Sequence, residues 1–460
     1  MRIIICGAGQ VGYSIASYLA REDNDVTVID QNPDLIRQIN NDLDVSGIVG
    51  HASHPEILEK AGADQADMIV AVTQTDEVNM VACQVAHSLF GVPKKIARVR
   101  AQTYRDPVWS NLFSRSHMPI DTIISPEVEV AEEINQRLTI PGTMNIIPLA
   151  DGKAHLAGVI CYDNCPVLHT QIRQLGTLFP DLPMEISLIL RRGTVLIPDS
   201  NEQLEEGDEV YFFTDTEHLP RVMAMFGHEE QKARHICILG GGNIGLYLAK
   251  LIEKEHKKVQ IKIIEYNAER AITLSEELQN IVVINGDGLQ HDILVEAAID
   301  KTETLIAVTD DDETNILGSL LAKQYGCERV ITLVNKSNYT NLITALGIDA
   351  VVTPRASTVS TIMQYVRRGK VKAVHTLRDG VAEVIEAEVA DTSSIANKKL
   401  CDLALPEDVD IGVIVRDNKV YIPTNDQNFM ILPGDHVVVL AKEGHARDIE
   451  QFFTVQVDLF

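Results

Sequence analysis

Short apolar runs alternate with helical stretches along much of this chain. Residues 2–6 (RIIIC), 26–30 (VTVID) and 68–73 (MIVAVT) are rich in β-branched residues, as buried strands are. Residues 14–19, between the first two runs, have the apolar spacing of a helix. Strands that alternate with helices predict βαβ units, and therefore a parallel sheet covered by helices.

The same pattern occurs twice. Residues 2–12 read RIIICGAGQVG and residues 235–245 read HICILGGGNIG, so the first glycines, Gly7 and Gly240, lie 233 positions apart. Each is followed by a helical run and then by a strand that ends in an acid. Further matched segments are MIVAVT with TLIAVT (304–309), QTDEVN with DDDETN, 96–100 with 331–335, and IISPE (123–127) with VVTPR (351–355). The chain is therefore a duplication.

The texture changes after each copy. Short alternating strands with turn signals occupy residues 141–230 and 371–460, and a Gly-Asp pair sits between two strand-like runs in each, at 207–208 and 434–435. The predicted domains are therefore two Rossmann-like doubly wound α/β domains, 1–140 and 231–370, each followed by a small α+β domain, 141–230 and 371–460. Pro141-Gly142 and Gly369 are the expected hinges.

Composition and charge exclude several functions. Hydrophobic residues make up 45% of the 460 residues and charged residues 23%, as in ordinary globular proteins. The net charge of −26 disfavours binding to nucleic acid or to an anionic lipid surface. No apolar stretch reaches the roughly 18–20 residues that a membrane span needs, and the N-terminus does not resemble a signal peptide. Without a membrane span or a signal peptide, the chain is expected in the cytoplasm. The seven cysteines lack the spacing of a metal site, so we expect no metal.

The two glycine turns carry the chemistry. In the pattern G-x-G-x-x-G, the first glycine permits a tight turn, the second lets the backbone approach a pyrophosphate, and the third allows close helix–strand packing. The phosphates then lie at a helix N-terminus, where free N–H groups favour an anion. The candidate nucleotide-binding residues are Gly7, Ala8, Gly9, Gln10, Val11 and Gly12 in the first copy, and Gly240, Gly241, Gly242, Asn243, Ile244 and Gly245 in the second.

An acid follows each turn at the end of the next strand. Asp30 lies 18 residues after Gly12, and Glu265 lies 20 residues after Gly245. A carboxylate there accepts hydrogen bonds from both ribose hydroxyls and repels a 2′-phosphate, which favours NAD(H) or an adenine nucleotide over NADP(H). The alternative is that these acids are exposed strand ends.

Further polar residues are expected at the carboxyl ends of strands, where open α/β sheets bind ligands. Each of them is also a residue type that caps helices or turns, so both interpretations stay open. The candidates are His51, Thr73 and Gln74 in the first copy, and Asp287, Thr309 and Asp310 in the second. Asp310 and Gln74 are also the expected helix caps, three residues before Glu313 and Glu77.

The two sites are not equivalent. The fifth strand of the first copy is expected to carry Arg98 and Arg100, which can meet phosphate oxygens, whereas the second copy has Leu333 and Asn335 there. The second site also has Asp287 and Asp310. We therefore expect it to be more acidic, and to hold a polyphosphate less firmly or prefer another ligand.

Two catalytic interpretations compete with a binding module. An NAD-dependent oxidoreductase needs an acid/base group beside the nicotinamide, and the histidines of the small domains share no matched position. A hydrolase would use the acidic run 310–313, although acids are common at helix starts. A regulatory module needs neither group.

The motifs CGAGQVG, VTVID, VAVTQTDE, IARVR and IISPE, then LGGGNIG, IKIIE and AVTDDDETN, closely resemble the TrkA family. These are cytoplasmic NAD-binding subunits of bacterial Trk potassium-uptake systems, built from RCK modules (regulators of potassium conductance). The resemblance covers essentially the whole chain.

The resemblance implies a homotetramer, in which eight RCK modules form a ring beneath a membrane-embedded potassium translocator of the TrkH type and gate it. It implies NAD(H), ATP and ADP as ligands, no catalysis, and a peripheral location at the cytoplasmic face of the membrane. The implied nucleotide positions are 7–11, Asp30, His51, Thr73, Gln74 and Arg98, and in the second copy 240–244, Glu265, Asp287, Thr309 and Asp310.

Overall fold

The chain divides into two compact units. Unit 1 comprises Met1–Glu129 and Pro354–Met363, and unit 2 comprises Val130–Thr353 and Gln364–Phe460. This is a computed structural model, and it describes residues 1–22, 24–336, 339, 346–366, 371–377, 380–403, 405–406, 408–423, 428–442, 444–445, 449 and 452–453. The expected hinge at Gly369 lies outside the described residues.

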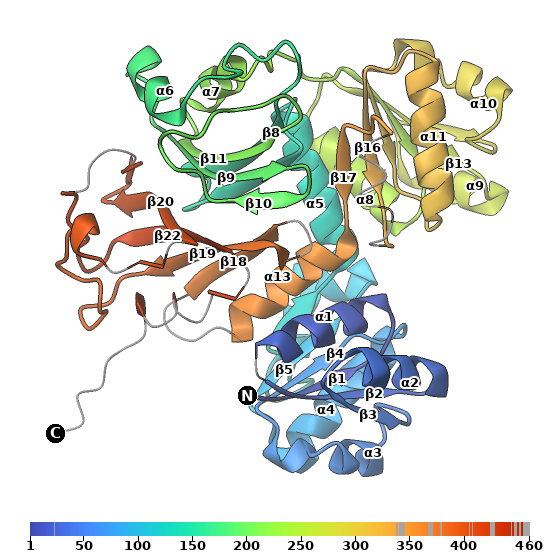
Figure 1. The fold of residues 1–460 in the computed structure, drawn as a ribbon. Coiled ribbons are helices and arrows are strands. Elements are labelled where there is room, and N and C mark those ends of the chain that lie inside the picture. The colour runs from blue at the N-terminus through green and yellow to red at the C-terminus, as the bar shows by residue number, and fades with distance from the viewer. Residues whose placement is uncertain are drawn as a thin grey trace. The chain divides into compact units, whose positions relative to one another are not determined.

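Unit 1 holds a six-stranded sheet in the order β3-β2-β1-β4-β5-β6, in which all neighbours pair in parallel (Figure 1). The order reverses between β1 and β4, at the position where open α/β sheets bind ligands. Its strands are β1 (Arg2–Cys6), β2 (Asp25–Asp30), β3 (Ser46–Val49), β4 (Met68–Ala71), β5 (Lys94–Arg98) and β6 (Thr122–Ile124). Its helices are α1 (Gln10–Arg21), α2 (Pro33–Asp42), α3 (Pro55–Lys60), α4 (Asp76–Phe90) and the 3-10 turns η1 (Ala63–Gln65), η2 (Gln102–Arg105) and η3 (Pro107–Phe113).

Burial explains why these segments fold as they do. The central strand β4 is buried at every residue, as a strand covered on both faces must be. Helix α1 buries Ile15, Ala16 and Leu19, which lie on one face at helical spacing. Complete burial of one Ile or Leu side chain contributes about 1.5–3 kcal/mol.

Unit 2 repeats this sheet. Its order is β14-β13-β12-β15-β16-β17, again all parallel, with the same reversal between the first and fourth strands. The strands are β12 (His235–Leu239), β13 (Gln260–Glu265), β14 (Val282–Asn285), β15 (Thr304–Ala307), β16 (Arg329–Leu333) and β17 (Ala350–Val352). The helices are α8 (Asn243–Glu255), α9 (Ala268–Glu277), α10 (His291–Glu296), α11 (Asp312–Gln324) and the 3-10 turn η4 (Ile299–Lys301). The two predicted Rossmann-like sheets are thus confirmed.

The predicted helix caps were wrong by one residue. Helix α11 begins after Asp311, whose side chain accepts a hydrogen bond from the Thr314 N–H. Asp310 is displaced from the cap because the Thr309 hydroxyl closes a tight turn onto the backbone of Asp311. In the first copy the cap residue of α4 is Thr75, not Gln74, and it makes no side-chain cap bond.

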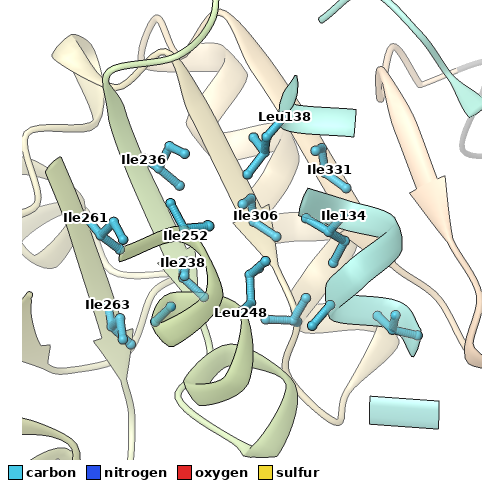
Figure 2. Close-up of a cluster of buried hydrophobic side chains, with 14 of the residues drawn as sticks. Ile134, Leu138, Ile236, Ile238, Leu248, Ile252, Ile261, Ile263, Ile306 and Ile331 are labelled. Carbon is cyan, nitrogen blue, oxygen red and sulfur yellow. The ribbon is translucent and has the colours of Figure 1, made fainter. Parts of the chain in front are cut away.

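Helix α5 (Pro126–Thr139) completes the core of the second sheet. Val130, Ala131, Ile134 and Leu138 pack in one buried cluster with residues of β12, β13, β15, β16 and α8. Figure 2 shows Ile134 and Leu138 beside Ile306 and Ile331. Polar contacts in the same place join Asn135 to Glu255 (2.7 Å) and Arg137 to the carbonyl of Val351 (2.8 Å). This helix precedes the second sheet by about a hundred residues, yet its C-terminal half belongs to that fold.

The reciprocal helix is α13 (Pro354–Val366), which follows the second sheet in sequence. Residues Pro354–Met363 of this helix belong to unit 1. Of these, Val359, Ile362 and Met363 are buried.

The two small domains are antiparallel sheets with one topology, as their matched texture predicts. The first sheet has the order β10-β9-β11-β8-β7. The second, read from the equivalent edge, has the order β21-β20-β22-β19-β18, so equivalent strands occupy the same places. The first contains β7 (Asn145–Leu149), β8 (Ala154–Ile160), β9 (Met184–Arg191), β10 (Thr194–Leu196), β11 (Glu209–Asp215), α6 (Ile172–Leu178) and α7 (Leu219–Met225). The second contains β18 (Val371–Leu377), β19 (Ala382–Glu388), β20 (Val409–Arg416), β21 (Lys419–Tyr421), β22 (His436–Lys442) and the 3-10 turn η7 (Leu400–Asp402).

The predicted Gly-Asp turns are present and tightly anchored. Gly207 and Gly434 have φ of +83° and +86°, a conformation that favours glycine. Each following aspartate is fully buried and forms a two-pronged ion pair, Asp208 with Arg191 (2.8 Å) and Asp435 with Arg416 (2.7 Å).

The two small domains share one apolar core inside unit 2. Leu156, Tyr211 and Phe213 of the first domain lie in the same buried cluster as Val413 and Leu440 of the second. Approach is so close at Gly412 that a Cβ there would lie 2.0 Å from the Phe213 ring. Hydrogen bonds join Ser187 to Asp410, the Ala150 N–H to Glu386 (2.8 Å), and Lys153 to Asn418 (2.7 Å).

In the part of the chain that the structure describes, no helix is long and apolar enough to cross a bilayer. Within the same residues, no group of three or more His, Cys, Asp or Glu side chains is arranged to hold a metal ion.

Candidate nucleotide sites

Both glycine turns adopt the conformation that their sequence predicts. Gly7 and Gly240 have φ of +110° and +105°, which side-chain-bearing residues rarely adopt. A Cβ at Gly12 would lie 1.8 Å from the Gly7 carbonyl oxygen, and one at Gly245 would lie 2.0 Å from the Gly240 oxygen. The first and third glycines are therefore required by the fold.

The second glycine of each turn is different. Gly9 and Gly242 are the N-cap residues of α1 and α8, both in extended conformation and without a side-chain cap bond. Both are exposed, and a Cβ at either would meet no atom within 4 Å. Gln10 and Val11, and Asn243 and Ile244, begin the helices that follow. The fold leaves open space at an uncapped helix start in both copies, which fits a phosphate group.

The acids are held against these turns. Asp30 accepts hydrogen bonds from the N–H of Ala8 (2.7 Å) and of Asn32 (2.8 Å). Glu265 accepts the equivalent bonds from Gly241 (2.7 Å) and Asn267 (2.8 Å). Each carboxylate oxygen uses one acceptor position in this way, and a carboxylate has about four, so each acid can still accept bonds from ribose hydroxyls.

Arg270 lies beside the second glycine turn and was not predicted from the sequence. Its Nε donates to the Gly241 carbonyl (2.8 Å), and a terminal nitrogen lies 3.4 Å from the Gly242 carbonyl. By the match of Asn32 with Asn267, the first copy has Leu35 there. The second site therefore carries a cation beside its turn, which weakens the expectation that it is simply the more acidic one. The sequence signal was an arginine five residues after Glu265.

The threonines that end the fourth strands take part in internal networks. Thr73 donates its hydroxyl to Asn79 (2.7 Å), and Asn79 in turn donates to the Arg98 carbonyl (3.0 Å). Thr309 and Asn315 repeat these contacts, with the second bond made to the Leu333 carbonyl. Both threonine side chains thus shape the strand ends, and their binding to a ligand stays a prediction.

Asp76 and Asp312 occupy equivalent positions in the two copies, and their roles were also not predicted from the sequence. The buried carboxylate of Asp76 accepts from the N–H groups of Arg100 and Ala101, and that of Asp312 accepts from Asn335 and Lys336. Each fixes the segment that leaves the fifth strand. The repeated pattern T-x-x-D-x-x-N in TQTDEVN (73–79) and TDDDETN (309–315) carried the signal.

The residues after the third strands form turns. The ring nitrogen Nδ1 of His51 lies 2.8 Å from the Ser53 hydroxyl, and its ring stacks on His54. Asp287 accepts from the Leu289 N–H (3.0 Å). Gln74 and Asp310 are exposed at the tips of their turns. These positions lie at the carboxyl edge of each sheet as predicted, while ligand contact there stays a prediction.

The arginines of the first site are paired with an acid. Arg98 lies 2.8 Å from Glu127, and Arg100 lies 3.7 Å from it. Burial, followed by the nearby charge of Arg98, lowers the pKa of Arg100. The prediction that both arginines lie on the fifth strand was wrong for Arg100, because β5 ends at Arg98 and the Arg100 N–H donates to Asp76 instead. In the second copy, Asn335 likewise lies beyond β16, which ends at Leu333.

This architecture has the fold of solved RCK domains. The RCK domain of GsuK matches with a TM-score of 0.60 at 18% identity, covering 98% of this chain and 94% of that chain. The structure titled "GsuK channel bound to NAD" matches with a TM-score of 0.59 at 18% identity, covering 98% of this chain and 78% of that one. At this identity the likeness concerns the fold.

Sequence similarity narrows the class to one family. The TrkA-N domain matches residues 3–126 and 236–354, and the TrkA-C domain matches residues 384–454. The Trk system potassium uptake protein TrkA of Azorhizobium caulinodans is 47% identical over 460 residues, and that of Halomonas elongata is 38% identical over 464, each with all of both chains covered. The chain belongs to the TrkA family of potassium uptake proteins. The strand order extends the TrkA-C fold to the first small domain, which the TrkA-C match does not include.

Proposed function

We propose that this chain is a nucleotide-sensing regulatory subunit that gates a membrane-embedded potassium translocator. The observation that carries the proposal is the pair of open glycine turns, each with its own acid hydrogen-bonded to the turn. A ligand drives gating only through a difference in its affinity for two states, and couplings of about 1–3 kcal/mol are typical.

The proposed ligands are NAD(H), with ATP and ADP as alternatives. Asp30 and Glu265 favour a free 2′-hydroxyl, and Gly9 and Gly242 leave room for phosphates. In the first site, Arg98 and Arg100 supply charge for a polyphosphate tail. The GsuK structures titled as bound to NAD and to ADP show that the fold accommodates both ligands in that protein.

The proposed partner is a translocator of the TrkH type, and the proposed assembly is a homotetramer of eight RCK modules at the cytoplasmic face of the membrane. The potassium-uptake names of the relatives support the partner. The absence of a membrane-spanning helix among the described residues is consistent with a peripheral subunit. We propose that the chain has no catalytic activity.

Ligand titration of the full-length chain tests the sites. Calorimetry with NADH, ATP and ADP should show binding that Asp30→Asn weakens at the first site and Glu265→Gln at the second. Loss of charge-assisted bonds worth about 1.5–3 kcal/mol predicts a decrease in affinity of roughly 10- to 100-fold. Asp64→Asn is the matched control, because this exposed acid of η1 lies outside the site and loses the same charge. Unchanged affinity in both site variants would show that the sites are misassigned.

A flux assay tests the role. Potassium flux through a reconstituted translocator should depend on this chain and respond to NADH, ATP or ADP, and the Asp30→Asn/Glu265→Gln variant should lose the response while still binding the translocator. An oxidoreductase would instead consume NADH with a small substrate, which absorbance at the nicotinamide band detects. Substrate-dependent NADH consumption would replace the regulatory proposal.

A further inference from the structure

Two cysteines of the first small domain share one buried turn. Cys161 and Cys165 follow β8, and both lie in the same core cluster with 0% and 5% of their surface exposed. The turn is closed by the Cys165 N–H, which donates to the Tyr162 carbonyl (2.9 Å). The interaction between the two thiols raises the pKa of Cys161 and lowers that of Cys165. The pair is therefore asymmetric, with Cys165 the better nucleophile.

The duplicated chain contains its own comparison. The second small domain has Val389 and Ser393 at these positions, in the same backbone turn. The N–H groups of Cys161 and Val389 each donate a hydrogen bond of 2.9 Å to the carbonyl of the aspartate in the following Gly-Asp turn. The N–H of Ser393 donates to the carbonyl three residues earlier (3.0 Å), as the N–H of Cys165 does (2.9 Å). Since the turn forms without sulfur, the fold does not require the two thiols.

A histidine–glutamate pair lies beside the cysteines. Nδ1 of His228 is 2.9 Å from Glu230, and its Nε2 is 3.0 Å from the carbonyl of Ile160, next to Cys161. Burial alone would lower the pKa of His228, but the hydrogen bond and charge of Glu230 raise it. The positive charge of His228 further lowers the pKa of Cys165.

The turn contacts the segment that leaves its domain, and the leaving segment packs against the entering one. A Cβ at Gly142, in the entering segment, would lie 2.5 Å from Glu230 Oε2 and 2.9 Å from His228 Cβ, in the leaving segment. A Cβ at Gly227 would lie 3.5 Å from the Cα of Cys165. A covalent change at the cysteines would therefore alter the packing of the segments that join this domain to the rest of the chain.

We propose that Cys161 and Cys165 form a redox-sensitive pair that closes to a disulfide when a small peroxide oxidises Cys165. The Cys165 thiolate attacks one peroxide oxygen, the O–O bond breaks, and the departing hydroxide is protonated to water. Cys161 then loses its proton and attacks the sulfur of the Cys165 sulfenic acid; the S–S bond forms and a second water leaves. The two thiols are together oxidised by two electrons, and one peroxide is reduced.

The burial of the pair selects the oxidant. Tyr162 is 47% exposed, its ring centroid lies 5.8 Å from that of His228 in an edge-on arrangement, and Cys165 is only 5% exposed. Hydrogen peroxide is small enough to reach such a sulfur after a minor movement, whereas a bulky disulfide reagent is not.

Peptide mass mapping of the full-length chain tests the proposal. Residues 154–173, between Lys153 and Arg173, form one tryptic peptide that contains these two cysteines and no others. After treatment with hydrogen peroxide and alkylation under denaturing conditions, this peptide should carry no alkyl group and should weigh two hydrogens less than the reduced form. Dithiothreitol should restore both alkylation sites. Hydrogen exchange should change at residues 141–144 and 226–230 on oxidation.

Three variants make the result decisive. Cys161→Ser should trap Cys165 as a dimedone-reactive sulfenic acid, and Cys165→Ser should leave Cys161 reduced. Cys161→Val/Cys165→Ser copies the second domain, so it should fold normally and lose the exchange response. The exposed Cys401 reports that the peroxide has acted. Full alkylation of the 154–173 peptide once Cys401 is oxidised, or oxidation of Cys165 beyond sulfenic acid without a disulfide, would overturn the proposal.

Discussion

Glycine occurs in each nucleotide turn for two separate physical reasons. At Gly12 and Gly245 the neighbouring backbone occupies the place of a side chain, whereas at Gly9 and Gly242 that place is empty. The first reason concerns folding, and the second concerns the proposed ligand. Substitution can therefore separate stability from binding within a single motif.

We expect Gly12→Ala to destabilise the protein by about 1–3 kcal/mol or more, because its Cβ meets a backbone oxygen that cannot move aside easily. Gly9→Ala should leave the free energy of unfolding nearly unchanged, since its φ of −65° suits alanine, but should weaken nucleotide binding. Urea unfolding and calorimetry on the two variants check this. Equal losses of stability would contradict the assignment of Gly9 to the ligand.

At the scale of elements, the exchange of helices between the duplicated sheets was not predictable from the sequence. Periodicity predicted the strands, the helices and their order, because burial on one face or both is a local property of residues such as Ile15 and Leu19. It gave no sign that Ile134 and Leu138 of α5 pack under β15 and β16, because an apolar helix face does not specify its partner.

At the nucleotide sites, too, features with a local cause were predictable from the sequence, whereas those that depend on packing were not. The turns and their acids were predicted because G-x-G-x-x-G has a local cause in backbone geometry. Arg270 was missed because its contact with Gly241 depends on how α9 packs. Asp76 was missed because its backbone partners lie about twenty-four residues away.

The start of α5 supplies a prediction at this scale. Glu127, in its first turn, pairs with Arg98 and Arg100, so a phosphate tail bound at the proposed first site would compete with this carboxylate for the same guanidinium groups. Glu127→Gln should therefore raise the affinity for ATP, on the order of tenfold, and that for AMP much less. Glu77→Gln, an exposed acid at the start of α4, is the control. Equal gains for ATP and AMP would show that Glu127 does not compete with the phosphate tail.

At the scale of the whole molecule, the halves of the duplication are not independent. The small domains share a core, and the C-terminal half of α5 completes the second sheet. A chain cut near residue 230 would expose both apolar surfaces. Comparisons of the two nucleotide sites therefore require point substitutions in the full-length protein.

The shared core predicts a compensating pair. Phe213 faces the second small domain, whereas Phe212 faces the core of its own domain. Phe213→Ala should cost about 3–5 kcal/mol and increase hydrogen exchange in β20 and β22, while Phe212→Ala should leave those strands protected. Gly412→Ala should destabilise the protein, but much less in the Phe213→Ala background, because the ring that its Cβ would strike is gone. Additive losses would contradict direct packing.

The shared core of the small domains also bears on how the protein behaves at low concentration. Two separate polypeptides that met through such a surface would come apart on dilution, whereas tethering both faces to one backbone gives them a fixed local concentration. This union is therefore unimolecular, and it persists however few copies of the chain a cell contains.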